Sequence, residues 1–243
     1  MDRWIGAAVA GLCGLTLPAA AMANVVYQTG FEPPGYTTGA LAGQNGWGGS
    51  LGTVETTTVF AGTQAVEYNA TGQSGQSLNG HAVPSAGQGS IMQVTEEFYV
   101  SANDPNVYWD ALSIFGNAGF VGQLVVHDGT AVLGLANSSV GSAAVSPGAW
   151  HSYTMDFNFG TGVQTAYVDG TLIGSGPLAT SSTLLTFVET GINDANGSAT
   201  SQAYVDNLSI TAPEPSSLML LGSGLAGLGV ISMGLGRRRR DRA

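Results

Sequence analysis

The sequence predicts an all-β domain over residues 24–212, built as an antiparallel two-sheet sandwich, and three patterns predict it. From His151 to Phe159, large apolar residues alternate with polar ones, as in a strand with one buried face. The dipeptide Asp169-Gly170 separates two further apolar segments and is a strong hairpin signal. No stretch of this region combines helical periodicity with capping residues. Short strands joined by Gly-, Asn- and Ser-rich turns are typical of a sandwich.

The remaining strands are expected where β-branched and aromatic residues lie between turn-forming residues. In chain order, the expected strands are Val25–Phe31, Val54–Phe60, Ala65–Asn69, Ile91–Ser101, Tyr108–Phe115, Gly119–His127, Ala131–Ala136, His151–Phe159, Val163–Val168, Thr171–Ile173, Leu184–Glu189 and Gln202–Thr211. The sequence shows neither a repeat nor a second domain, and Thr211–Pro215 is expected to link the domain to the C-terminal segment.

The N-terminus has the three parts of a secretory signal peptide. A short charged start ends at Arg3, an apolar run extends from Ile5 to Ala21, and Ala21-Met22-Ala23 supplies the small residues before a cleavage site after Ala23. Cys13, the only cysteine of the chain, lies in this segment. The mature protein is therefore expected to be exported and to contain no disulfide.

The domain carries no basic side chain. All six basic residues of the chain are Arg, at position 3 and beyond position 236, whereas 13 of the 16 acidic residues lie within residues 24–212. The domain therefore has a formal charge of −13. Such a surface does not neutralise a phosphate backbone, so we expect no nucleic-acid partner. The domain also lacks a Lys for a Schiff base and an Arg for an anion clamp.

The C-terminus predicts a membrane segment with a positively charged end. Pro213-Glu214-Pro215 precedes an uncharged apolar stretch from Ser216 to Gly236. The stretch is close to the ~20 residues that cross a bilayer as a helix. A cluster of arginines follows it, which would stay in the cytoplasm and leave the domain outside. The members of this cluster are Arg237, Arg238, Arg239 and Arg240.

The Pro-Glu-Pro motif, the apolar stretch and the Arg cluster, in this order, resemble the PEP-CTERM sorting signal of Gram-negative bacteria. The resemblance covers residues 213–243. It implies transient residence in the inner membrane and cleavage by exosortase, a membrane cysteine transpeptidase, so that the hydrophobic tail is absent from the mature protein, as in a GPI signal. It also implies an association with exopolysaccharide and biofilm. An ordinary single-span anchor is the alternative interpretation.

The domain itself carries a second, more degenerate resemblance. Its opening segment Val25–Glu32 and closing segment Ala203–Ile210 resemble the first and last strands of concanavalin-like jelly rolls, and Tyr167–Gly170 resembles laminin-G-like and lectin domains. The resemblance implies a jelly-roll sandwich with a lectin-like function. It also implies a structural Ca²⁺ near Glu32 and Asp206, where the first and last strands would pair. Carboxylates without basic partners suit this ion.

The sequence offers no pattern of a catalytic site. None of the acidic residues of the domain pairs with another at spacing two or four, which would place both on one face of a strand for glycoside hydrolysis. Glu96 and Glu97 are adjacent and therefore point to opposite faces. The histidines His81, His127 and His151 lack zinc-site spacing, and the domain has no Gly-x-Ser-x-Gly motif. Acids from different strands can still meet in the fold.

Three aromatic residues are candidates for stacking on sugar rings. Trp47 lies in a Gly-rich loop, and Tyr108 and Trp109 are adjacent, so one of these two is expected to face the core. The alternative interpretation is packing, with Trp47 as a lid over one end of the sandwich.

Together these features predict an exported, exosortase-processed, non-catalytic surface or extracellular-matrix protein. Its sandwich would bind extracellular polysaccharide in a lectin-like manner. A charge of −13 disfavours acidic polysaccharides unless Ca²⁺ bridges the two. Two alternatives stay open. One is a secreted polysaccharide hydrolase or lyase on the same fold, against which the missing carboxylate pair and missing basic residues count, and the other is a ligand-free display protein.

Overall fold

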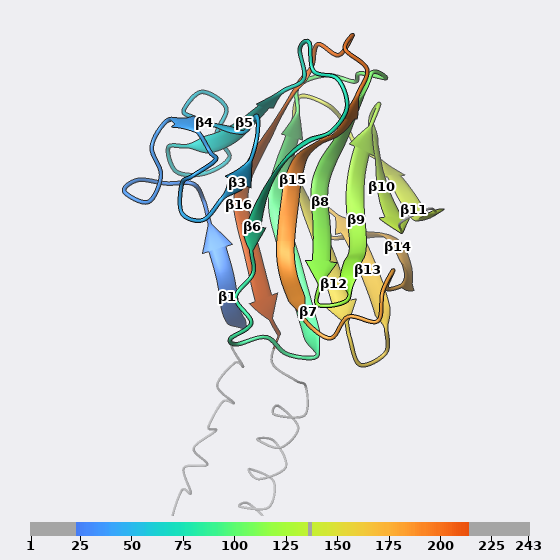
Figure 1. The fold of residues 1–243 in the computed structure, drawn as a ribbon. Helices are drawn as coiled ribbons and strands as arrows, with labels where there is room; N and C mark the ends of the chain where they lie inside the picture. The colour runs from blue at the N-terminus through green and yellow to red at the C-terminus, as the bar shows by residue number, and fades with distance from the viewer. Residues whose placement is uncertain (1–22, 136–137, 214–243) are drawn as a thin grey trace, which may run out of the picture. The chain divides into compact units, whose positions relative to one another are not determined.

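The computed structural model describes residues 23–135 and 138–213, and these residues form an all-β sandwich (Figure 1). Ala23–Pro213 make one compact unit with its own hydrophobic core. The expected signal peptide and sorting signal, including the helix expected at residues 216–236, lie outside the described residues. Within the described part, no helix is long and apolar enough to span a membrane.

The described residues contain sixteen strands, which pair in antiparallel ladders. In chain order they are β1 (Asn24–Thr29), β2 (Gly39–Ala40), β3 (Gly48–Gly49), β4 (Thr53–Glu55), β5 (Ala65–Asn69), β6 (Ser77–Ala82), β7 (Ile91–Val100), β8 (Val107–Gly116), β9 (Gly119–His127), β10 (Thr130–Leu135), β11 (Ser138–Ala144), β12 (Trp150–Asn158), β13 (Val163–Val168), β14 (Thr171–Pro177), β15 (Leu185–Ala195) and β16 (Gln202–Ala212).

The strands form two layers that face each other across the core (Figure 1). One layer has the order β2-β4-β5-β16-β7-β12-β13-β14, with β1 beside β16, and the other has the order β11-β10-β9-β8-β15-β6-β3. The sequence predicts two separate sheets, but pairing between β14 and β11 joins the layers at one edge. The sandwich is therefore a single 16-stranded sheet folded over on itself.

Two glycines make this junction possible. Gly141 of β11 pairs with Gly174 of β14. A Cβ on Gly141 would lie 2.0 Å from the carbonyl oxygen of Ile173, and a Cβ on Gly174 would lie 2.9 Å from the Cα of Gly141. Only residues without a side chain allow the two backbones to approach this closely.

The core lies between the layers and is filled by alternate residues from both. Val94 and Phe98 point inward from β7, and Ile114 and Leu124 point inward from β8 and β9; each is at most 1% exposed. Burial of such a side chain stabilises the fold by roughly 1.5–3 kcal/mol. The intervening side chains point outward, so the same strands also build the two outer faces of the sandwich.

Strands with clear periodicity lie where the sequence predicts them. The bounds of β5, β9 and β13 match the prediction. Asp169 and Gly170 form the predicted hairpin with φ of 50° and 72°, as a type I′ turn requires. The pattern does not indicate β6 and β11, because their segments SLNGHA and SSVGSAA contain few β-branched or aromatic residues. Both are strands because their neighbours pair with them.

Candidate functional site

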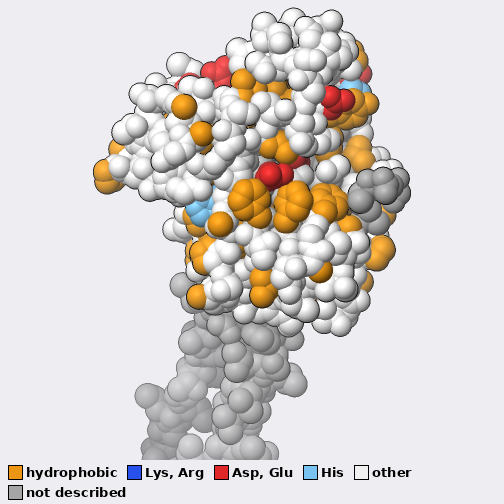
Figure 2. Space-filling view, in the orientation of Figure 1, with side chains coloured by type: hydrophobic (Ala, Val, Ile, Leu, Met, Phe, Trp, Pro, Cys, Tyr) orange, Lys and Arg blue, Asp and Glu red, His pale blue; other side chains and the backbone are white. Residues whose placement is uncertain are grey.

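One outer face of the sandwich carries three phenylalanine rings in a row. Phe187 of β15 pairs with Phe115 of β8, and Phe115 pairs with Phe120 of β9. The ring centroid of Phe115 lies 5.7 Å from that of Phe120 and 6.4 Å from that of Phe187. All three side chains are partly exposed. Figure 2 shows this phenyl row as a line of large hydrophobic side chains across the middle of the face.

A polar row lies beside the phenyl row on the same strands. Glu189 of β15 pairs with Ser113 of β8, and Ser113 pairs with Gln123 of β9. In Figure 2 an acidic side chain lies directly above the hydrophobic line. Gly80 of β6 pairs with Glu189, and a Cβ on Gly80 would lie 2.3 Å from the ring of Phe187. This glycine therefore leaves the space that the phenylalanine ring occupies.

A second aromatic pair lies further along the same face. The ring of Tyr108 in β8 stacks on the imidazole of His127 in β9, with centroids 3.7 Å apart and planes at 5°. Tyr108 is 43% exposed. It lies about 23 Å from Phe115 along the strand at the usual rise per residue. The face thus has aromatic rings at both ends and hydrogen-bonding groups between them.

A fully buried carboxyl lies next to the polar row. Asp110 of β8 pairs with Gly191 of β15 and is therefore diagonal to Glu189, a relation that places two Cα atoms about 7–8 Å apart. Burial raises the pKa of Asp110 to about 8; the Ser113 hydroxyl opposes this shift and the Glu189 charge adds to it. Neither carboxyl oxygen of Asp110 has a hydrogen-bond partner among the described residues. Asp110 is therefore mostly protonated at neutral pH.

Asp110 and Glu189 are not arranged for glycoside hydrolysis. That reaction needs two carboxyls that both reach the glycosidic bond, one as the acid and the other as base or nucleophile. Asp110 is 0% exposed, so it cannot donate its proton to a ligand on this face. Glu189 is accessible, and burial raises its pKa. The face can therefore bind rings and hydroxyl groups, but it does not present two reactive carboxyls.

Glu96 is a second carboxyl that the fold buries completely, on the inner side of β7. Burial raises the pKa of Glu96 well above its ordinary value, and the charges of Asp110 and Glu97 add to the shift. Its oxygens and the Tyr68 hydroxyl have no hydrogen-bond partner among the described residues. Glu97 is half-buried on the opposite side of the strand, as the sequence predicts. Unpaired groups of this kind cost stability and have no access to a ligand.

The structure places two of the three predicted sugar-stacking residues in the core. Trp47 and Trp109 are 2% and 1% exposed, so neither ring offers a face to a ligand. Trp47 packs inside, and its Nε1 donates to the hydroxyl oxygens of Tyr27 and Tyr36 at 3.2 and 3.1 Å. Tyr108 is accessible and lies on the same face as the phenyl row.

The structure brings Glu32 and Asp206 to the same loop. Asp206 Oδ2 accepts the backbone N–H groups of residues 60 and 61 at 3.2 and 3.0 Å, and Glu32 Oε1 accepts those of residues 63 and 64 at 2.8 and 3.0 Å. The carboxylates thus anchor this loop. Their oxygens face N–H and O–H donors, including the Thr63 hydroxyl, which donates to Glu32 Oε2, whereas in a Ca²⁺ site oxygens surround the ion, so the arrangement does not fit that cation. Calcium binding at these residues stays a prediction.

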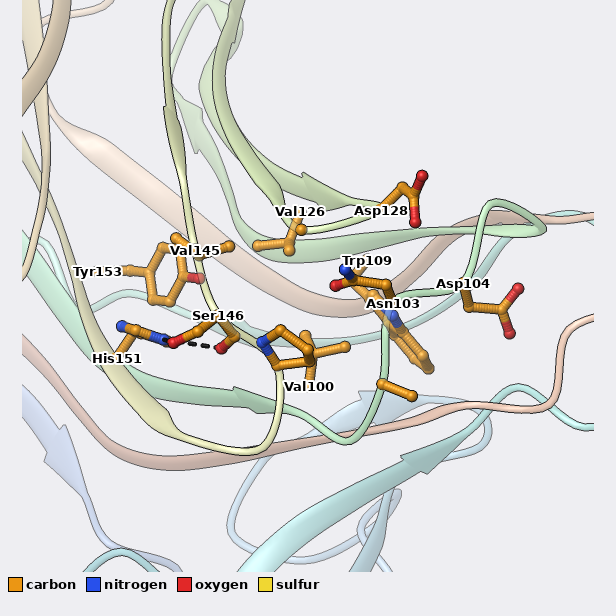
Figure 3. Close-up of a pocket in the computed structure, with 13 residues that line it drawn as sticks. Val100, Asn103, Asp104, Trp109, Val126, Asp128, Val145, Ser146, His151 and Tyr153 are labelled. Carbon is orange, nitrogen blue, oxygen red and sulfur yellow. Dashed lines mark hydrogen bonds between the residues drawn. The ribbon is translucent and has the colours of Figure 1, made fainter.

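Figure 3 shows a small cavity lined from both layers, with Trp109 and Tyr153 among its lining residues. Its volume is about 10 Å³, enough for one water molecule at most, so it does not hold a sugar ring. At its rim, His151 Nδ1 lies 2.7 Å from Asp169 Oδ2 and His151 Nε2 lies 3.3 Å from Ser146 Oγ. The sequence gives no signal for this arrangement, whose order of contacts is that of a Ser-His-Asp triad.

The geometry around His151 does not activate the serine. His151 Nε2 lies closer, at 2.9 Å, to the backbone carbonyl oxygen of Ser146. Nε2 is therefore placed to donate a hydrogen bond to that carbonyl oxygen rather than to accept the proton of the serine hydroxyl. We interpret His151 as a clamp that joins the turn at Ser146 to the hairpin at Asp169.

No protein-family model and no curated protein sequence matches this chain. Solved structures with the same fold do match it. Cellulose-induced protein Cip1 has a TM-score of 0.59 and 12% identity, over 76% of this chain and 96% of that one. The carbohydrate esterase vb_24B_21 of Shiga toxin-encoding bacteriophage phi24B has a TM-score of 0.57 and 16% identity, over 79% and 100%. The receptor-binding domain of botulinum neurotoxin D has a TM-score of 0.53 and 14% identity, over 83% of this chain and 53% of that one. These likenesses establish a jelly-roll sandwich fold.

Proposed function

We propose that this chain is an exported, non-catalytic protein that binds an extracellular polysaccharide on the face with the phenyl row and the polar row. The observation that carries the proposal is the phenyl row, three partly exposed rings in register on an open sheet face. Adjacent large apolar side chains at a surface mark an interaction site. A pyranose ring presents a face of C–H groups that can be buried against such rings, while the partly exposed side chains of Glu189 and Gln123 bind its hydroxyl groups; Ser113, between them, is only 4% exposed.

The names of the matching solved structures support carbohydrate as the ligand class. One protein is described as induced by cellulose and another as a carbohydrate esterase. The ligand-binding domain of botulinum neurotoxin D, with a TM-score of 0.51 and 15% identity, was solved in complex with N-acetylneuraminic acid. For this chain, the phenyl row is independent support for the same ligand class.

Retention of the Ala23–Pro213 domain on insoluble polysaccharides tests the proposal. We expect binding to at least one of cellulose, chitin, xylan and cross-linked chitosan. Phe115→Ala combined with Phe187→Ala should weaken that binding about tenfold or more. The matched control is Leu172→Ala, which removes an exposed apolar side chain from β14 in the other layer. Absence of retention on every polymer, or an equal loss in the control, would refute the proposal, and release of soluble sugar would favour the hydrolase or lyase alternative.

We further propose that residues 1–23 direct export and that exosortase removes the segment that follows the Pro-Glu-Pro motif, so that the domain acts at the cell surface or beyond it. The order of motif, apolar stretch and Arg cluster supports this proposal. The fold is compatible with it, because Asn24 pairs with Ala212, so the two ends of the domain lie side by side. Their removal leaves the paired ends of β1 and β16 intact.

The mass of the protein in a Gram-negative host tests the processing step. In a strain with an exosortase, the exported protein should lack the segment beyond the Pro-Glu-Pro motif. Deletion of the exosortase gene should leave a full-length tail in the inner membrane. An identical mass in both strains would favour the ordinary membrane anchor.

A further inference from the structure

Glu189 is a charged side chain on the ligand face, and nothing of opposite charge balances it. Residues 24–212 contain no Lys or Arg. The pKa of Glu189 is raised by burial alone, with no hydrogen bond or positive charge to offset the shift. A Cβ on Gly80 would lie 3.1 Å from Glu189 Cγ, so the side chain lies over β6, close to the sheet. The carboxylate is thus partly desolvated and has no partner among the residues that the structure describes.

The position of Glu189 relative to the phenyl row decides what it would contact. It follows Phe187 by two residues on β15 and lies on the same face, about 7 Å along the strand. A sugar ring stacked on Phe187 or Phe115 would therefore direct one of its ring substituents toward the carboxylate. The chemistry of that substituent sets the specificity of the site.

Three kinds of substituent would behave differently beside this carboxylate. A uronate or sulfate would add a negative charge next to Glu189, in a domain that has many acidic residues and no Lys or Arg to offset them. A hydroxyl or an acetamide would donate a hydrogen bond and leave the charge uncompensated. An ammonium group would donate a hydrogen bond to the carboxylate and also neutralise its charge. Charge-assisted hydrogen bonds of this kind are about twice as strong as neutral ones.

Resting on the proposed function, we propose that the polysaccharide held by this face is an amino-sugar polymer with free ammonium groups, and that Glu189 is the residue that selects it. The rings of the phenyl row bind the apolar faces of the sugars, and Glu189 pairs with the ammonium of a sugar stacked beside it.

Calorimetric titration of the Ala23–Pro213 domain with three size-matched oligosaccharides tests this inference. The ligands are hexamers of glucosamine, of N-acetylglucosamine and of galacturonic acid, used at a pH where the amine is protonated. We expect the glucosamine hexamer to bind about tenfold more tightly than the acetylated hexamer, and the galacturonate hexamer to bind most weakly. Added salt should weaken the first and leave the second nearly unchanged.

The decisive variant is Glu189→Gln, which keeps the shape of the side chain and removes its charge. It should abolish the tenfold preference and leave the affinity for the acetylated hexamer unchanged. The matched control is Glu97→Gln, because Glu97 is also a half-buried strand carboxylate but lies on β7 in the other layer. That variant loses the same charge from the domain and should keep the preference.

The outcomes separate this inference from the function on which it rests. An equal loss of preference in both variants would show general attraction of a polycation to an acidic domain and would overturn the inference. Equal affinity of the wild-type domain for the glucosamine and acetylated hexamers would also overturn it, while carbohydrate binding would stand. If no hexamer binds and the Phe115→Ala, Phe187→Ala variant behaves like the wild type on every polymer, the proposed function fails and the inference with it.

Discussion

Replacement of Asp110 by Asn should stabilise the domain at neutral pH. The pKa of Asp110 is about 8 in the fold and about 3.9 in an unfolded chain. Between these values the native state keeps a proton that the unfolded state has released. The free energy of unfolding therefore falls as the pH rises through this window, with a slope of about 1.4 kcal/mol per pH unit.

The size of the effect follows from the width of this window. At pH 7, roughly three units above the pKa of the unfolded state, the free energy of unfolding has fallen by about 4 kcal/mol relative to its value below pH 4. Below about pH 4 both states hold the proton, and above about pH 8 both have released it, so the slope from Asp110 disappears outside the window. Asn does not ionise and fits the same space. Asp110→Asn should therefore recover most of this free energy at pH 7 and change little at pH 4.

Urea unfolding followed by tryptophan fluorescence, from about pH 4 to about pH 9, measures this difference. Glu96 contributes a slope of the same sign, because burial raises its pKa too, so the test is the difference between wild type and variant. The control is Leu172→Ala, which truncates an exposed side chain that does not ionise and should leave the slope unchanged. Equal slopes for wild type and Asp110→Asn would show that Asp110 is ionised in the fold and would refute the reasoning.

Three further predictions follow from other contacts. Gly141→Ala should destabilise the domain by about 2 kcal/mol or more in urea unfolding, because its Cβ would lie 2.0 Å from the carbonyl oxygen of Ile173; unchanged stability would mean that the β11–β14 junction does not form. Gly80→Ala should displace the ring of Phe187 and weaken polysaccharide retention about fivefold, with little change in stability. Unchanged retention would contradict the proposal that the phenyl row binds the polysaccharide. Asp206→Asn should lower the free energy of unfolding by about 1–2 kcal/mol, because it weakens hydrogen bonds to the backbone. The loss should be the same in Ca²⁺ and in EDTA. A calcium-dependent rise in melting temperature that the variant abolishes would instead confirm the predicted Ca²⁺ site.

The sequence predicts the fold class because the strands that carry it have local signals. Alternation in β12 and the Asp169-Gly170 turn depend on residues close in the chain, so pattern alone identifies them. The junction between the layers has no such signal. It depends on Gly141 meeting Gly174, two glycines among the 37 in the chain, and only the pairing of β11 with β14 distinguishes them from the others.

The ligand face is less predictable from sequence than the fold. The phenyl row takes one ring from each of three strands, and a register shift between β8 and β9 next to Phe115 helps to bring Phe120 into line. No one-dimensional pattern encodes that alignment. For Trp47 the sequence suggests a ligand-binding residue that the structure does not expose. Its Gly-rich loop suggests an accessible ring, but the ring is buried. In the fold its ring packs against Phe31 and His81, and its Nε1 donates to the hydroxyl groups of Tyr27 and Tyr36, all of which lie outside the loop.

The junction of β11 and β14 also bears on how the sheet edges could meet other chains. Edge strands expose unpaired backbone groups, and these invite pairing with other copies. β11 and β14 pair only at Gly141 and Gly174, so the junction closes that side of the sandwich at one point. At the other side the sheet order ends in β2 and β3, which are two residues long each, whereas β1, which is six residues long, pairs only with β16. Among the described strands, the outer edge of β1 is therefore the longest of these three templates for pairing with another chain.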